Sequence, residues 1–214
     1  MRTGRESRPA VERMAAGSAA LLMVAGAAGL AVATGGYARV AGYVSESGVT
    51  GAPRAGLYRW SVICVGCAVA LLAVVLRGSS RPAATLLAGA APCAIVSSVV
   101  RCTRGCPLPP YEAPTAADLV HAGASIAGLL LLGGAMLVLA RPGVDGPVRR
   151  VGRGGLTVAV PLLAAAGMSM AVAGRGAATG VLERVALAAA LGWLVAVAVA
   201  RALPRRRLTA GTST

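Results

Sequence analysis

The stretch of sequence that decides the fold is AADLVHAGASIAGLLLLGGAMLVLA, residues 116–140. After Asp118 its only ionisable side chain is His121, and leucine, glycine and alanine dominate its second half. A helix needs about 20 predominantly apolar residues to cross the hydrocarbon core of a bilayer. The sequence therefore predicts a transmembrane helix at 116–140.

The composition of the whole chain is typical of a membrane protein. Of the 214 residues, 57% are hydrophobic and 13% are charged, whereas a soluble domain contains about 25% charged residues. The net charge is +14, and every basic residue is arginine. A nucleic-acid-binding protein carries its basic residues on a solvated face, but these arginines lie between apolar segments. We therefore expect a lipid bilayer as the partner, and no nucleic acid.

Five further apolar runs are long enough to cross a bilayer. They are residues 14–35, 58–76, 83–100, 156–173 and 180–203. The first run resembles a signal peptide, but it is longer than the usual apolar core of about 7–15 residues, so we favour a retained helix. The predicted fold class is all-α: a polytopic membrane protein, a bundle of six transmembrane helices with tails at 1–13 and 204–214.

Prolines and glycines mark irregular places in this plan. Pro92 and Pro161 fall inside predicted helices, where proline is tolerated if neighbouring groups satisfy the carbonyl that it frees, and we expect a kink at each. Residues 141–155, RPGVDGPVRRVGRGG, combine glycine, proline and arginine. This composition predicts a basic loop between the fourth and fifth helices.

The distribution of arginine predicts the orientation. If both termini are cytoplasmic, the inner segments hold fourteen arginines and the outer segments hold seven. Basic residues near the ends of transmembrane helices are retained on the cytoplasmic side. We therefore predict a multi-pass protein of the plasma membrane with both its N-terminus and its C-terminus in the cytoplasm.

Residues 101–125, RCTRGCPLPPYEAPTAADLVHAGAS, form a polar island between apolar segments. Thr115 and Asp118 have the spacing of a capping box at a helix start, so Asp118 is either a capping residue or a functional one. His121 and Ser125 follow Asp118 on the same helical face. A polar stripe that enters the bilayer normally faces the bundle interior or a water-filled cavity; the alternative is a histidine that contacts headgroups or water.

The five cysteines divide into two groups. Cys102 and Cys106 lie in the outer loop, where an oxidising environment permits a disulfide, and a turn through Gly105 brings their Cα atoms within the required distance of about 7 Å. We therefore predict that they are bridged. The other cysteines lie in predicted helices, where cysteine packs as a small apolar residue; they are Cys64, Cys67 and Cys93. We expect no metal site and no cofactor.

Three segments resemble one known family. They are VSESGVTGAPRAGLYRW (44–60), RCTRGCPLPP with DLVHAG (101–110 and 118–123), and GVLERVALAAALGWL (180–194). Together they resemble the bacterial and archaeal proteins designated domain of unknown function nine-nine-eight, over about residues 15–203. The resemblance implies six helices and no established activity. The residues that it marks are Ser45, Glu46, Gly48, Gly51, Pro53, Cys102, Cys106, Asp118, His121 and Arg184.

Five charged or ionisable residues lie at the outer ends of helices or in outer loops under this topology. They are Glu46, Asp118, His121, Glu183 and Arg184. If the loops fold over the bundle, these side chains form one ion-paired cluster on the extracytoplasmic face. The alternative for Glu183 and Arg184 is that they balance the terminus of the sixth helix, where an acidic residue is favourable in the first turn.

Three classes of function remain open. The favoured one is a non-enzymatic envelope protein whose outer polar site binds a lipid headgroup or a protein partner. The second is a lipid-modifying or hydrolytic membrane enzyme centred on His121, Asp118 and Glu46. The third is a small transporter, for which interrupted helices are the indicator. No nucleophile elbow, P-loop or dinucleotide fingerprint occurs, so no residue is assigned a catalytic role.

Overall fold

The computed structural model describes residues 3–35 and 42–203, and this part of the chain contains helices and no strand. The predicted tail at 204–214 lies outside the described residues. Within these described ranges, six helices are long and apolar enough to cross a membrane, so the predicted six-helix architecture is confirmed. These spans are Ala10–Thr34, Ala55–Leu76, Arg81–Val99, Ala116–Leu139, Gly146–Ala173 and Ala177–Ala202.

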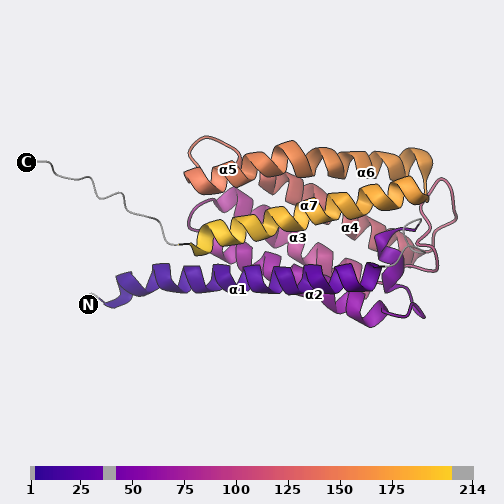
Figure 1. The fold of residues 1–214 in the computed structure, drawn as a ribbon, viewed down its shortest axis with the longest axis horizontal. Coiled ribbons are helices and arrows are strands. Elements are labelled where there is room, and N and C mark those ends of the chain that lie inside the picture. The colour runs from indigo at the N-terminus through magenta and orange to yellow at the C-terminus, as the bar shows by residue number, and fades with distance from the viewer. Residues whose placement is uncertain (1–2, 36–41, 204–214) are drawn as a thin grey trace, which may run out of the picture.

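The helices form an elongated bundle with their axes along its length (Figure 1). Helices that follow one another in sequence pack together, and the last returns to contact the first. They are α1 (Thr3–Thr34), α2 (Ala55–Leu76), α3 (Arg81–Val99), α4 (Ala116–Leu139), α5 (Gly146–Gly154), α6 (Val160–Ala173) and α7 (Ala177–Ala202). The start of α1 and the end of α7 lie at the same end of the bundle.

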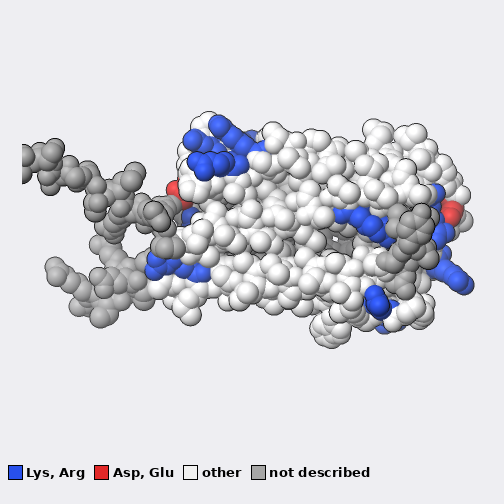
Figure 2. All heavy atoms as spheres, viewed as in Figure 1, with Lys and Arg blue, Asp and Glu red and all other residues white. Residues whose placement is uncertain are grey.

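We name the two ends by their residues. The terminal end contains the start of α1, residues 77–80, residues 140–153 and the end of α7. The loop end contains residues 42–54, 100–117 and 174–184, including the short 3-10 helix η2 (Val44–Gly48). Figure 2 shows arginines at both ends of the face in view and almost none along its middle, as expected for a protein whose middle is surrounded by lipid.

The fifth span is longer than the sequence predicts. The basic loop expected at 141–155 is wrong for its second part, because α5 begins at Gly146 and runs without a break into the π-helix η3 (Gly155–Ala159) and α6. Pro147 stands in the first turn of α5, where its missing N–H costs nothing. A Cβ on Gly152 would lie 2.5 Å from the carbonyl carbon of Leu139, so this glycine lets α5 pack directly against the end of α4.

Small residues hold the other helices close together. A Cβ on Gly66 of α2 would lie 2.8 Å from Ile95 of α3, and one on Gly26 of α1 would lie 2.9 Å from the carbonyl oxygen of Ser61. Lipid removes the hydrophobic drive between helices, so close backbone approach and dispersion must replace it. The bundle is therefore stabilised by glycine contacts of this kind around a core that includes Leu72, Leu87 and other apolar side chains.

Candidate functional site

At the loop end, two carboxylates hold the start of η2. Glu46 Oε1 accepts the backbone N–H of Tyr43 at 2.9 Å, and Glu183 Oε2 accepts the backbone N–H of Val44 at 2.8 Å. The first contact lies within η2 and caps it, whereas the second joins η2 to α7. Burial, followed by the negative charge of Glu183, raises the pKa of the Tyr43 phenol above its usual value.

Two arginines complete this arrangement. Arg175 donates from Nε to Glu46 Oε1 at 2.7 Å and from Nη2 to Glu46 Oε2 at 2.6 Å, which is the bidentate geometry that guanidinium and carboxylate favour. Its hydrogen bond to Glu46 raises the pKa of Arg175. Arg184 donates to the carbonyl oxygens of Gly42 and Gly180, at 3.0 and 2.8 Å. Arg175 was not predicted from the sequence; the only signal was its position in the short turn between the last two predicted helices.

Asp118 is buried at the start of α4, with 2% of its surface exposed. Its carboxylate accepts the backbone N–H and the hydroxyl of Thr115 at 2.8 and 2.7 Å, and the Thr115 hydroxyl accepts the N–H of Asp118. The predicted capping box is therefore confirmed. The same carboxylate accepts the backbone N–H of Thr103 at 2.6 Å. Asp118 thus ties the preceding loop to the helix that it caps.

Cys102 and Cys106 are joined by a disulfide, with their Cα atoms 5.0 Å apart. The turn between them uses Gly105, whose φ of +91° favours glycine. Thr103 lies inside the closed ring and is the residue that donates to Asp118. Both cysteine side chains pack against Tyr43. The disulfide loop consequently lies between η2 on one side and α4 on the other.

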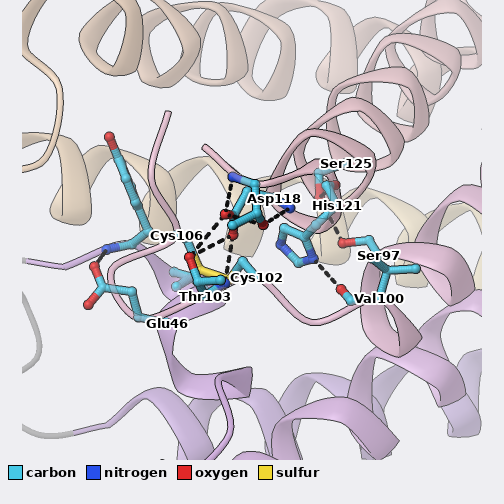
Figure 3. Close-up of a disulfide and its surroundings, with 12 residues drawn as sticks. Glu46, Ser97, Val100, Cys102, Thr103, Cys106, Asp118, His121 and Ser125 are labelled. Carbon is cyan, nitrogen blue, oxygen red and sulfur yellow. Dashed lines mark hydrogen bonds between the residues drawn. A yellow bond between two sulfur atoms is a disulfide. The ribbon is translucent and has the colours of Figure 1, made fainter. Parts of the chain in front are cut away.

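His121 lies one turn below Asp118 on α4 and is buried. Its Nδ1 is 3.0 Å from the carbonyl oxygen of Val100 (Figure 3). A carbonyl can only accept, so Nδ1 carries a proton in this contact. Ser125 donates to the carbonyl oxygen of His121, and its Oγ is 2.7 Å from Ser97 Oγ. The polar stripe on α4 therefore faces α3, inside the bundle.

A small pocket lies beside His121. Its volume is about 10 Å³, which is space for about one water molecule. Its lining residues with polar side chains are Ser45, Tyr58, Arg59, Ser97, Ser98, Arg101 and His121. No carboxylate from the described part of the chain lines it. The pocket therefore has room for about one oxygen atom, and two basic residues, Arg59 and Arg101, are among those that line it.

The predicted site residues divide into two groups. Glu46 and Glu183 meet at η2, with Arg184 close by. Asp118 and His121 belong instead to the disulfide loop and the pocket, and within the described residues no ion pair joins either of them to the first group. No group of three or more His, Cys, Asp or Glu side chains in the described ranges is placed to hold a metal ion.

The comparison with protein families is consistent with this architecture. The model of the family described as "Protein of unknown function (DUF998)" matches residues 15–200. The chain belongs to the DUF998 family. No curated protein and no solved structure matches the chain. The family description names no activity, so the function of this DUF998 protein has to be inferred from the geometry and charge of its own residues.

Proposed function

We propose that this DUF998 protein is a non-enzymatic membrane protein whose loop end binds the phosphate of an anionic lipid headgroup. The observation that carries the proposal is the charge of the pocket beside His121. Arg59 and Arg101 line it, and in the described part of the chain neither makes an ion pair. Guanidinium groups favour phosphate oxygens, which they bind in bidentate geometry.

Three nearby carboxylates support the proposal because they already accept hydrogen bonds from protein groups. Asp118 accepts hydrogen bonds from Thr103 and Thr115, Glu46 pairs with Arg175, and Glu183 accepts the backbone N–H of Val44. None of them is left to neutralise the two arginines of the pocket. We therefore infer that an anion from outside the protein neutralises the two arginines of this pocket.

The position of the pocket favours a lipid over a soluble anion. Arg59 lies in the second turn of α2, and its neighbour Trp60 has 68% of its surface exposed. Exposed tryptophan near the end of a transmembrane helix marks the headgroup level of a membrane, where its amphipathic ring is favourable. The guanidinium of Arg59 and the phosphates of the adjacent leaflet then stand at the same height. The pocket admits one phosphate oxygen, while the rest of the headgroup stays outside.

The test uses purified protein in phosphatidylcholine nanodiscs, titrated with short-chain phosphatidylglycerol, short-chain phosphatidylcholine or inorganic phosphate. We expect phosphatidylglycerol to raise the melting temperature and phosphatidylcholine to have little effect. The double variant Arg59→Gln/Arg101→Gln removes the response, whereas Arg104→Gln, an exposed arginine of the same end outside the pocket, retains it. If phosphatidylglycerol raises the melting temperature of these two variants equally, the proposal is overturned. If inorganic phosphate raises the melting temperature as much as the lipid does, the lipid assignment is overturned.

We further propose that the loop end faces away from the cytoplasm and that the membrane is the plasma membrane. The two-to-one excess of arginine in the segments assigned to the inside supports this orientation. The common position of the start of α1 and the end of α7 is consistent with it, because an even number of spans returns the chain to its starting side.

An enzyme centred on His121 is the second candidate. The Val100 carbonyl holds the proton on Nδ1 and leaves Nε2 as a base, which is how a catalytic histidine is oriented. The two carboxylates expected to assist it, Asp118 and Glu46, are engaged in other contacts. The variant His121→Gln separates the candidates: it keeps headgroup binding in the nanodisc titration if His121 only lines the pocket, and it abolishes hydrolysis of a fluorogenic phospholipid if His121 is the base.

A further inference from the structure

A second, apolar groove lies at the opposite end of the molecule from the proposed headgroup site. It runs between the α5–η3 segment and α7 and has a volume of about 280 Å³. One wall contains Val151, Gly154 and Gly155, and the other contains Gly192 and Trp193. The remaining lining residues are valine and alanine. The groove is apolar throughout, so its occupant is a hydrocarbon group.

The indole of Trp193 forms the floor of the groove and is held in place by two contacts. Its Nε1 donates to the carbonyl oxygen of Val151 at 3.1 Å. A Cβ on Gly155 would lie 2.5 Å from the indole, so the glycine is what allows η3 to rest on the ring. The indole edge therefore cannot leave this position without losing its hydrogen bond to the Val151 carbonyl.

The sides of the groove are open because two glycines flank it. A Cβ built on Gly154 or on Gly192 meets no atom within 4 Å. From Val151 to Ala159 the helix rises about 12 Å, which is close to half of the hydrocarbon thickness of about 30 Å. The groove therefore has the depth of one leaflet, and it begins where the helix enters the membrane from the terminal end.

Arginines stand at the membrane-surface end of the groove. Arg150 lies one turn before Gly154 and Arg153 directly precedes it, and both side chains are exposed. Figure 2 shows basic side chains gathered over α5. The neighbouring acid Asp145 pairs with Arg201 of α7, and within the described ranges neither Arg150 nor Arg153 makes an ion pair. Basic pockets between transmembrane helices are suited to anionic headgroups.

We propose that this groove binds one acyl chain of an anionic phospholipid, with the phosphate held by Arg150 and Arg153. The acyl chain lies along Gly154 and Gly192 over the face of Trp193. The apolar walls select a hydrocarbon chain, the depth matches one leaflet, and the arginines select negative charge. This site is independent of the headgroup site at the loop end, because the two lie at opposite ends of the bundle.

The position of Trp193 provides a direct assay. The chain has two tryptophans, and Trp60→Phe leaves Trp193 as the only one. In phosphatidylcholine nanodiscs we expect brominated phosphatidylglycerol to quench Trp193 fluorescence at lower mole fractions than brominated phosphatidylcholine does. Arg150→Gln/Arg153→Gln raises the half-quenching mole fraction by about fivefold for each arginine. Arg77→Gln/Arg81→Gln, which removes two exposed arginines of the same end, leaves it unchanged.

The glycine walls provide the matched test of the acyl chain. Gly192→Leu places a branched side chain in the groove, and its Cβ meets no protein atom within 4 Å. We expect it to abolish preferential quenching by the anionic lipid. Gly167→Leu on α6 is the control, since a Cβ there also meets nothing within 4 Å and Gly167 lies outside the groove. Equal quenching by the two brominated lipids, or unchanged quenching in Gly192→Leu, overturns the proposal. Arg59→Gln/Arg101→Gln should not change the quenching of Trp193. Failure of the proposed headgroup site at the loop end can therefore be distinguished from failure of the proposed acyl-chain groove.

Discussion

The carboxylate of Asp118 accepts the backbone N–H of Thr103 at 2.6 Å and the Thr103 hydroxyl at 3.0 and 3.1 Å. The same carboxylate caps α4 through Thr115. One buried side chain therefore joins the disulfide loop to the first turn of a transmembrane helix. The residue that appeared functional from its position in a polar island is fully engaged in organising that island.

Replacing Asp118 by alanine should destabilise the protein strongly. The change removes a helix cap worth about 1 kcal/mol and leaves buried N–H donors unpaired, at a cost of about 1–3 kcal/mol. We expect the free energy of unfolding, measured by denaturant titration in detergent micelles, to fall by about 2–4 kcal/mol. Asp118→Asn keeps one acceptor oxygen and should lose less. Glu112→Gln, at an exposed residue of the same loop, is the control; a loss in Asp118→Ala no larger than in this control contradicts the prediction.

Opening the Cys102–Cys106 disulfide should weaken the contact between Thr103 and Asp118. For a ring of five residues the loop-entropy expression gives about 2 kcal/mol. We expect Cys102→Ser/Cys106→Ser and Asp118→Ala to be non-additive, because both changes release Thr103 from the same place. A combined variant whose loss of unfolding free energy equals the sum of the two separate losses would show that the disulfide does not position Thr103.

The two partners of the Glu46–Arg175 ion pair should behave differently when each is removed. Arg175 is 47% exposed, and exposed pairs contribute about 0–1 kcal/mol, so Arg175→Ala should cost little. Glu46→Ala also removes the acceptor of the Tyr43 N–H and should cost about 1–2 kcal/mol more. Unfolding of both variants in low and high salt measures the difference. Equal losses for the two variants would show that capping of η2 contributes nothing.

The sequence was sufficient to predict features that depend on local spacing. The number of helices follows from the lengths of the apolar runs, because the bilayer thickness sets the length required. The capping box followed from the three-residue interval between Thr115 and Asp118. Both features are set by neighbouring residues and by the surrounding solvent. They do not depend on how distant segments meet.

Features that depend on distant contacts were not predictable. Arg175 meets Glu46 across 129 positions of the chain, and no local pattern indicates that pairing. The composition of 141–155 predicts a loop throughout, but Gly152 packs against the backbone at the end of α4 and makes a helix favourable there. The proposed acyl-chain groove depends on Gly192 facing Gly154 and Gly155 across two helices. Which residues face each other across two helices is known only from the three-dimensional packing of those helices.

The predicted orientation can be checked by labelling in intact cells. In a background with Cys64, Cys67 and Cys93 replaced by alanine, Thr50→Cys at the loop end should react with a membrane-impermeant maleimide added from outside. Ser79→Cys at the terminal end should react only after the membrane is permeabilised. Cys102 and Cys106 are bonded to each other and do not react. The reverse pattern of labelling would overturn the assignment of the termini to the cytoplasm.

Two adjacent glycines should respond to alanine with opposite signs. Gly154 and Gly155 both have helical backbone angles, so alanine fits either position without strain. At Gly154 the added methyl meets open space, and the loss of glycine's flexibility should stabilise the helix by about 0.5–1 kcal/mol. At Gly155 the methyl would lie 2.5 Å from the indole of Trp193, and overpacking of this kind costs about 1–3 kcal/mol.

The two variants therefore measure how firmly Trp193 is held. If displacing the indole is costly, Gly155→Ala lowers the melting temperature and Gly154→Ala raises it. Trp193 fluorescence then changes only in the first variant, because the displaced indole loses its hydrogen bond from Nε1 to the Val151 carbonyl. If both variants melt at the same temperature, the indole has moved aside at no cost. In that case η3 does not depend on Gly155, and the groove floor is not the fixed surface that an acyl chain would require.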